Sequence, residues 1–383
     1  MRKPTLPKPF LLIIVVILCL AQLSVSARAE SQSWKKIAGP NDAHYQSVDM
    51  ISSTDGWAVG SEGNIARWDG TKWNKVESPT KYKLASLCMV SSTEGWAIAQ
   101  RTDGYLTNQS IIKWDGTSWR NVKSPTEGVL TSVDMANSSD GWAVGFGGII
   151  IRWDGASWNR MKEPIYYSVE FPSGVVEVPF DLPLESVDIV SSTEGWAVGE
   201  KAAIIRWNGT SWDLEREPEF SGAPWLWSVD MVSSTDGWAV GSSGDIMRWN
   251  GTSWEYVESP TAEHLFSVDM VSSNEGWAVG ATGSIIRWDG TSWNNVTSPT
   301  TAGLKSVDMV NSNEGWIAGA DGIYRWQVSG GFPGDHLVVT IAVTIVVVVA
   351  AVVVWFFTKN RIAHKSTERE VTEHQSSRVG VWL

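Results

Sequence analysis

The stretch from Ser267 to Thr300, SVDMVSSNEGWAVGATGSIIRWDGTSWNNVTSPT, is the cleanest copy of a repeat that occupies most of this chain. Each copy places one tryptophan after a glycine, a second after an arginine or lysine, and a third after a serine or lysine. The first of these tryptophans occurs seven times, at Trp57, Trp96, Trp142, Trp196, Trp238, Trp277 and Trp316. Repetition at about forty residues is typical of solenoids and propellers.

The two ends of the repeat region complete one another. The seventh copy stops after Trp326 and lacks its third tryptophan, while Ser33 to Pro40, SWKKIAGP, matches the missing SWNNVTSP. A last repeat that is finished by the first segment of the chain indicates a closed ring.

Every copy contains four short runs of strand type. In the cleanest copy they are SVDMV, WAVG, SIIRW and SWNNV, all rich in β-branched or aromatic residues. An Asp-Gly or Asn-Gly pair before the fourth run is a strong hairpin signal. The sequence therefore predicts an all-β seven-bladed β-propeller over residues 33–326, with the N-terminal strand closing the last blade.

Two apolar segments outside the repeats predict a membrane protein. Residues 1–29 have basic residues, an apolar stretch and Ala27-Arg28-Ala29, the pattern of a secretory signal peptide. After a linker at 327–336, residues 337–357 carry no charge and are long enough for a transmembrane helix. Basic residues at the start of the tail, 358–383, predict a cytoplasmic C-terminus. We expect a single-pass protein of the cell membrane with its propeller on the outer side.

Charge and composition narrow the classes of ligand. The formal net charge is -12, and the basic leader and tail leave about -18 for the propeller. An acidic surface of this kind disfavours nucleic acid. No His-rich or Cys-rich metal pattern and no phosphate loop occurs, so we expect neither a metal nor a cofactor. Cys88 is expected to be a small buried strand residue.

Two polar positions recur with the tryptophans. Six repeats have an aspartate in SVD and an arginine before the second tryptophan, whereas the second repeat has Cys88 and Lys113 instead. This joint exception predicts an Asp–Arg pair on neighbouring strands of each blade. We expect the arginine also to stack on indole rings, and the tryptophans beside each Asp-Gly turn to pack together. The turn residues Asp69, Asp115, Asp154 and Asp289 are interpreted as turn formers.

Candidate functional residues lie where the repeat is broken. The distance from the third tryptophan to the next SVD serine is 28 residues after Trp158 and 16 after Trp212, against 13 in four other repeats. The second repeat also has an insertion, RTDGYLTNQS. Propeller topology places all three on one face, which favours that face for binding. They carry the candidate ligand-binding residues Tyr105, Tyr166, Tyr167, Phe171, Trp225 and Trp227. The alternative is that the longest insert folds back to cap its own blade.

The repeats resemble those of photosystem II assembly and stability factor-like proteins, within the wider BNR (Asp-box-like) group. The resemblance covers about residues 33 to 326 and rests on EGWAVG, the following glycine and the DG-x-x-W step. The spacing of W-A-V, I-x-R-W-D-G and S-W is also similar to tectonin-type lectin repeats. The first resemblance implies a protein-binding assembly role outside the cytoplasm, and the second implies carbohydrate binding.

Three classes of function follow. We predict a non-enzymatic cell-surface scaffold that binds another extracytoplasmic protein. The alternative is a lectin that binds a glycan. A sialidase-like glycosidase is the third, because Asp-box propellers occur in sialidases, but no catalytic residues are assigned: the arginines outside the repeat positions are scattered, and no spacing supports a nucleophile.

Overall fold

The computed structural model describes residues 31–40, 43–100, 110–161, 166–171, 174–179, 181–218 and 222–329. The predicted signal peptide (1–29), transmembrane segment (337–357) and tail (358–383) lie outside them, as does most of the predicted linker. Among the residues described, no helix has the length and apolar character needed to cross a membrane.

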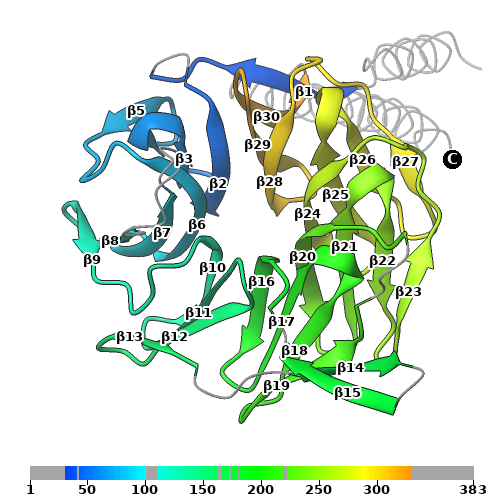
Figure 1. The fold of residues 1–383 in the computed structure, drawn as a ribbon. Helices are drawn as coiled ribbons and strands as arrows, with labels where there is room; N and C mark the ends of the chain where they lie inside the picture. Colours follow the sequence, from blue (N-terminus) through cyan, green and yellow to red (C-terminus); the bar gives the residue numbers. More distant parts are fainter. Residues whose placement is uncertain are drawn as a thin grey trace, which may run out of the picture. The chain divides into compact units, whose positions relative to one another are not determined.

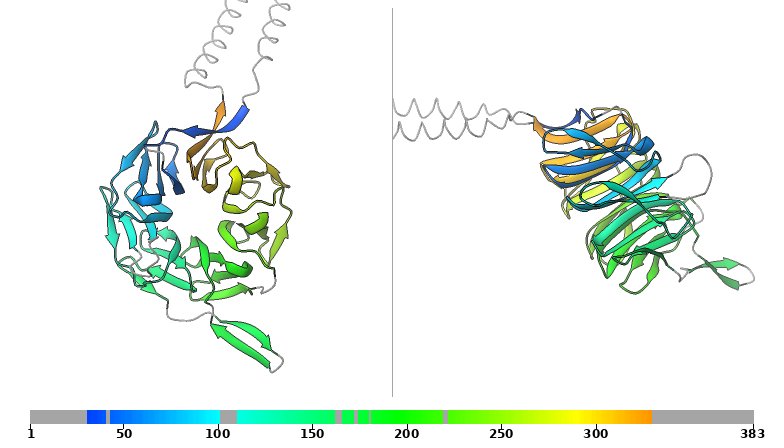
Figure 2. Two further views of the ribbon diagram at one scale, coloured as in Figure 1. Left: turned by 45° about the horizontal axis from the view of Figure 1, so that its top comes forward. Right: turned by 90° about the vertical axis from the view of Figure 1, so that its left-hand side faces the viewer.

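Residues 32–327 form one compact unit that contains seven four-stranded sheets (Figures 1 and 2). The first strand of each sheet is the innermost: β2 (Tyr45–Ser52), β6 (Lys83–Ser91), β10 (Leu130–Asn137), β16 (Leu184–Ser191), β20 (Leu226–Ser233), β24 (Leu265–Ser272) and β28 (Leu304–Asn311). These innermost strands contact one another in cyclic order, with β28 against β2. The predicted seven-bladed propeller is therefore confirmed.

The other strands continue each blade outward as antiparallel ladders. The second strands are β3 (Asp55–Gly60), β7 (Glu94–Gln100), β11 (Asp140–Gly145), β17 (Glu194–Gly199), β21 (Asp236–Gly241), β25 (Glu275–Gly280) and β29 (Glu314–Gly319). The third are β4 (Ile65–Trp68), β8 (Ser110–Trp114), β12 (Ile149–Trp153), β18 (Ile204–Trp207), β22 (Ile246–Trp249), β26 (Ile285–Trp288) and β30 (Gly322–Ser329). The fourth are β5 (Trp73–Val76), β9 (Trp119–Val122), β13 (Trp158–Arg160), β19 (Trp212–Arg216), β23 (Trp254–Val257) and β27 (Trp293–Asn295). Short 3-10 turns follow four of the second strands: η1 (Ser61–Gly63), η2 (Glu200–Ala202), η3 (Ser242–Gly244) and η4 (Ala281–Gly283).

The seventh blade takes its outer strand from the other end of the chain. β1 (Ser31–Ile37) pairs with β30, so the sheet order is β1-β30-β29-β28. Trp34 packs edge-on against Trp277 at 5.4 Å, and its ring is tilted against that of Trp326 at 5.5 Å. The predicted closing strand is confirmed, and it supplies the missing third tryptophan.

The tryptophans join neighbouring blades. Trp68 and Trp73 pack across their hairpin at 5.7 Å, as expected. Trp316 of the preceding blade inserts between them, 4.7 Å from Trp68 and edge-on to Trp73 at 5.2 Å. The same triplet recurs at every interface, so indole packing between blades supplies much of the core. The repeated tryptophans therefore determine the contacts between neighbouring blades as well as the packing within each blade.

The predicted Asp–Arg pair is wrong. Arg67 binds Asp55, in the Asp-Gly-Trp step, at 2.9 Å, and its guanidinium lies 5.0 Å from the Trp57 ring as expected. Asp49 instead accepts the backbone N–H of Met89 in the next blade. The SVD aspartate and the repeat arginine both change in blade 2, to Cys88 and Lys113, but these two changes are independent. Lys113 pairs with Glu94, the counterpart of Asp55, at 2.7 Å.

The SVD aspartates form a belt of hydrogen bonds between the innermost strands. Asp134, Asp188, Asp230, Asp269 and Asp308 each accept the backbone N–H of the equivalent residue of the following blade, at 2.6–2.8 Å. We call these five and Asp49 the aspartate belt. Cys88 takes the seventh place, and its thiol donates to Asp134 at 3.3 Å. Burial raises the pKa of Asp49 and of Asp230 to about 7. Burial raises the pKa of Asp269 and of Asp308, and a carboxylate two blades away adds to each effect, Asp49 for Asp269 and Asp230 for Asp308. The belt therefore follows the ring of innermost strands around the central channel.

The longest insert forms a separate hairpin. β14 (Tyr166–Phe171) pairs with β15 (Gly174–Pro179) and with no blade strand. Figure 2 shows this hairpin projecting from the ring of blades. The structure therefore gives no support to the alternative in which the insert caps its own blade.

Candidate functional site

The candidate site is built on two positions that vary from blade to blade. A buried residue begins the core of each innermost strand: Tyr45 in the first blade and leucine in the other six. The residues immediately before and after it differ between blades, although the SVD that follows is nearly constant. The residue after it falls at a register shift, where an extra residue enters the innermost strand. We call the end of the channel that these positions surround the channel mouth.

The connections between successive blades and the loops that follow the second strands lie at the end of the blades that carries the channel mouth. The N–H of Ser242, after the second strand of blade 5, donates to the carbonyl of Trp225 in the blade connection at 2.9 Å. The N–H of Ala281 donates in the same way to the carbonyl of His264 at 2.8 Å. The longer connections at 161–184 and 216–226 therefore open on the face that carries the channel mouth.

The structure places two predicted site residues at the mouth. Trp225 and Trp227 occupy the two variable positions of blade 5, and both are partly exposed. The indole N–H of Trp225 donates to the carboxylate of Glu185 in blade 4 at 3.1 Å. Each of these tryptophans thus contacts a neighbouring blade.

The other predicted site residues are not brought to the mouth. Tyr166, Tyr167 and Phe171 lie in β14 of the projecting hairpin, and their side chains are outside what the structure describes. Tyr105 also lies outside the described residues. For these four residues the site assignment stays a prediction.

An aromatic arc extends from Trp227 into blades 6 and 7. The Trp227 ring lies 5.1 Å from His264, edge-on, and 5.3 Å from Phe266. The Nζ of Lys305, in blade 7, lies 3.9 Å from the centre of the Phe266 ring. Three blades therefore contribute to one partly exposed surface of aromatic rings with an ammonium at its end.

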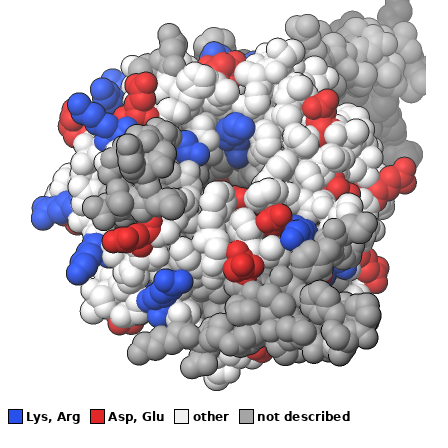
Figure 3. All heavy atoms as spheres, in the orientation of Figure 1, with Lys and Arg blue, Asp and Glu red and all other residues white. Residues whose placement is uncertain are grey.

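Charged groups from blades 2, 4 and 7 lie at the mouth. Burial lowers the pKa of Lys83, in blade 2, and Glu185 partly offsets this effect. Burial also lowers the pKa of Lys305, and the positive charge of Lys83 lowers it further. Burial raises the pKa of Glu185 to about 7. Figure 3 shows basic groups at the rim of the central hollow, with acidic groups across it.

Sequence reasoning missed Lys83, Glu185, His264, Phe266 and Lys305. A signal for them was present, because they occupy the two variable positions on either side of the buried strand residue. Comparison of the blades at those two positions would have found the site without a structure.

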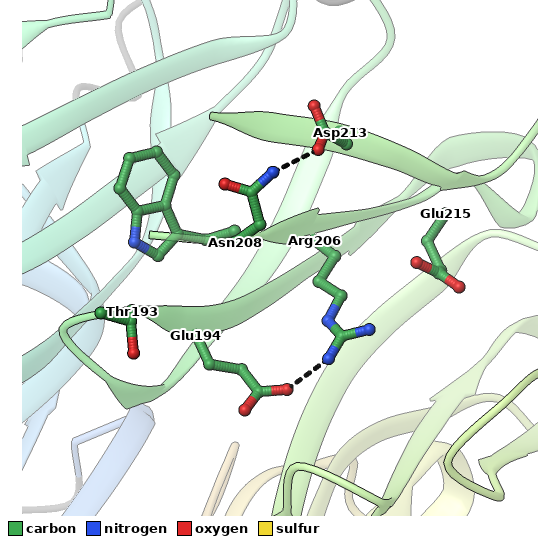
Figure 4. Close-up of a pocket in the computed structure, with 7 residues that line it drawn as sticks. Thr193, Glu194, Arg206, Asn208, Asp213 and Glu215 are labelled. Carbon is green, nitrogen blue, oxygen red and sulfur yellow. Dashed lines mark hydrogen bonds and ion pairs between the residues drawn. The ribbon is translucent and has the colours of Figure 1, made fainter. Parts of the chain in front are cut away.

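The opposite end of the blades carries shallow polar pockets. One, of about 390 Å³, is lined by residues of blade 4 (Figure 4), and a similar one of about 440 Å³ occurs in blade 6. In the first, Arg206 pairs with Glu194 at 2.7 Å and Asn208 donates to Asp213. These polar groups satisfy one another, which makes the pockets weaker candidates than the mouth.

The turn carboxylates act as turn formers. Asp69 Oδ1 accepts the Thr71 hydroxyl at 2.6 Å and the backbone N–H groups of Lys72 and Thr71 at 2.9 Å, and these bonds lower the pKa of Asp69. Asn208 accepts the corresponding pair from Thr210 and Ser211. The described part of the chain contains no cluster of His, Cys, Asp or Glu suited to a metal ion.

Neither a family model nor a curated protein sequence matches the chain. Solved structures do match it in fold. A structure described as YCF48 bound to D1 peptide has a TM-score of 0.59 and 16% identity, covering 78% of this chain and 95% of its own. YCF48 from Cyanidioschyzon merolae has a TM-score of 0.58 and 18% identity, with coverage of 77% and 98%. A streptogramin B lyase structure has a TM-score of 0.62 and 15% identity, with coverage of 79% and 100%. At these identities the likeness shows the propeller fold alone, which unrelated functions share.

Proposed function

We propose that this chain is a non-enzymatic binding protein whose channel mouth holds a segment of another protein. The observation that carries the proposal is the arc of Trp227, His264 and Phe266, which ends at Lys305 on the one part of the innermost strands that varies. Aromatic residues are enriched at protein-binding surfaces, and tryptophan is among the residues that contribute most to binding there. The YCF48 structure with a bound D1 peptide is one case in which a propeller of this fold binds a peptide.

The proposed setting is the outer side of a cell membrane. The leader at 1–29 and the apolar segment at 337–357 support export followed by anchoring, and the partner is then an extracytoplasmic protein. A membrane-held scaffold needs no catalytic group. In three blades the repeat arginine binds one carboxylate oxygen of a glutamate. In three others it binds both oxygens of an aspartate. This arrangement leaves few free guanidinium groups for an anionic substrate.

Site-specific photo-cross-linking tests the proposal. A benzophenone amino acid would replace Glu263, the exposed neighbour of His264, in the full-length chain expressed in its own host. The matched control places the same group at Val190, which is 38% exposed at the far end of an innermost strand. We expect discrete protein adducts from position 263 and none from position 190.

Three results would contradict the proposal. Equal adducts from both positions would indicate nonspecific contact. No adduct from position 263 would remove the mouth as a protein-binding site. Loss of the adducts when free sugars are added would favour the lectin alternative.

A further inference from the structure

Lys83 and Lys305 are an unusual pair in an acidic propeller. They come from blades 2 and 7, where each adjoins the buried leucine at the mouth end of an innermost strand, Leu84 or Leu304, and both are partly buried. The positive charge of Lys83 adds to the lowering of the Lys305 pKa that burial causes. Neither has an ion-pair partner within the described part of the chain, whereas the repeat arginines and Lys113 are all paired. Two desolvated like charges cost free energy that a bound anion would offset.

The surroundings of the pair limit the kind of anion. Glu185 adjoins the buried Leu184 at the mouth end of blade 4, and its charge offsets part of the lowering of the Lys83 pKa. The three groups together carry a formal charge of only +1. A singly charged carboxylate matches this value better than a phosphate dianion. A polyanion such as nucleic acid would also meet the acidic remainder of the propeller.

The aromatic arc supplies a second recognition element. The Lys305 ammonium lies 3.9 Å from the centre of the Phe266 ring, and the Trp227 ring packs against Phe266 with 5.3 Å between the ring centres. The rings of Phe266 and Trp227 would therefore lie beside an anion that is bound by Lys305. Because the arc is partly exposed, an apolar side chain beside the anion would bury additional surface.

We infer that the channel mouth recognises a peptide carboxylate adjacent to an aromatic or aliphatic side chain, with Lys83 and Lys305 binding the carboxylate and Phe266 and Trp227 contacting the apolar group. This inference rests on the proposed function, since it states which chemical group of the partner the mouth selects. The carboxylate has two sources, a chain terminus or the side chain of Asp or Glu.

Calorimetric titration of the full-length chain with short peptides tests the inference. The probes are acetyl-Ala-Phe with a free carboxylate, the same peptide as its amide, and acetyl-Phe-Glu-amide, whose only carboxylate is on a side chain. We expect the first or the third to bind and the amide of the first not to bind. The stronger of the two acids identifies the source.

Substitutions then locate the binding. Lys83→Met and Lys305→Met should each weaken acid binding by about tenfold or more, which corresponds to about 1.4 kcal/mol. Lys305→Arg should retain most of the affinity because it keeps the charge. The matched control is Lys75→Met, which removes an exposed lysine from outer strand β5 and should leave binding unchanged. Near-ultraviolet circular dichroism shows that each variant is folded.

The inference is overturned if the amide binds as well as the acid, if neither acid binds, or if folded Lys83→Met and Lys305→Met variants bind like the wild type. These results are separable from failure of the proposed function. Protein adducts at position 263 that persist without any acid preference would retain the scaffold and remove the carboxylate site.

Discussion

The Nζ of Lys305 lies 3.9 Å above the ring of Phe266, across the boundary between blades 7 and 6. Within the described blades, each arginine or lysine that lies over a repeat tryptophan also has a carboxylate partner. Lys113, for example, lies over Trp96 and pairs with Glu94. Lys305 has no carboxylate partner of this kind among the described residues. We infer from this difference that the cations within the blades stabilise the fold, whereas Lys305 is available to a ligand.

Binding of a carboxylate should depend on the charge of Glu185. Because burial raises the pKa of Glu185 to about 7, this group loses its negative charge as the pH falls through that value. Repulsion of a bound carboxylate then decreases, so acid peptides should bind more tightly at about pH 6 than at about pH 8. Calorimetry at both pH values measures the effect.

Glu185→Gln is the control for this pH dependence. It keeps an acceptor for the indole N–H of Trp225 but cannot ionise. We expect tight binding at both pH values. An unchanged pH dependence in this variant would assign it to another group, of which His264 beside Trp227 is the first to test by substitution with Asn.

Arg67 should be energetically coupled to Asp55 and not to Asp49. Arg67 donates from Nε and from a second nitrogen to the two oxygens of Asp55, at 2.9 and 3.0 Å. A double-mutant cycle with Arg67→Met and Asp55→Asn should give a coupling free energy of about 1 kcal/mol in chemical unfolding. In the cycle with Arg67→Met and Asp49→Asn, the two changes in unfolding free energy should be additive. A coupling free energy in this second cycle would support the Asp49–Arg67 pair that the sequence predicted.

The aspartate belt should make the propeller more stable in mild acid than at neutral pH. Burial raises the pKa of Asp230 to about 7, so the native state keeps a proton that the unfolded chain releases from about pH 4 upward. Stability is therefore full below about pH 4 and decreases as the pH rises toward about 7. Thermal unfolding across this range should show a falling Tm.

Asp230→Asn should make the stability less dependent on pH. The loss of unfolding free energy between about pH 4 and about pH 7 should be smaller than in the wild type by about 1 kcal/mol or more. The amide oxygen still accepts the N–H of Met270, and the side chain no longer ionises. Glu258→Gln, which removes an exposed carboxylate, is the matched control. Equal slopes in Asp230→Asn and the wild type would show that the belt does not set the pH dependence.

Trp34 should be required for closure of the ring. It is buried against Trp277 and Trp326, and it is the only one of the three that comes from the N-terminal segment. Trp34→Ala should lower the free energy of unfolding by about 3–5 kcal/mol, and Trp34→Phe by less. Denaturant unfolding measures both. Wild-type stability in the alanine variant would mean that pairing of β1 contributes little to closure.

The architecture could be predicted because its determinants are repeated in sequence. Seven copies of one tryptophan pattern specify seven equivalent blades, and the match of Ser33–Pro40 to the end of the repeat specifies closure. Hairpin packing such as Trp68 with Trp73 follows from the short turn between them. These contacts are local or repeat exactly one blade away, so spacing along the chain reveals them.

The partners of the polar groups could not be read from spacing. Arg67 had two acidic candidates in its blade, and only the strand order and register decide between them: Asp49 lies in β2, with Trp57 of β3 between it and Arg67, whereas Asp55 lies in the adjacent β3. The interaction of Lys83 with Glu185 depends on the curvature of the ring, because the two residues come from blades 2 and 4 and the whole of blade 3 lies between them in sequence. Trp225 and Trp227 were found because they stand outside the repeat, whereas Lys83 and Lys305 resemble ordinary surface lysines in sequence.

The central claim is that ligand binds at the channel mouth, and amide hydrogen exchange of the full-length chain locates binding directly. Exchange would be measured with and without saturating acetyl-Ala-Phe or acetyl-Phe-Glu-amide, whichever binds more tightly. The account predicts slower exchange confined to the segments that surround the mouth, at 82–86, 183–187, 224–228, 263–267 and 303–306. Protection confined to the hairpin at 166–179 or to the turns at the opposite end of the blades, or no protection in any segment, would contradict it.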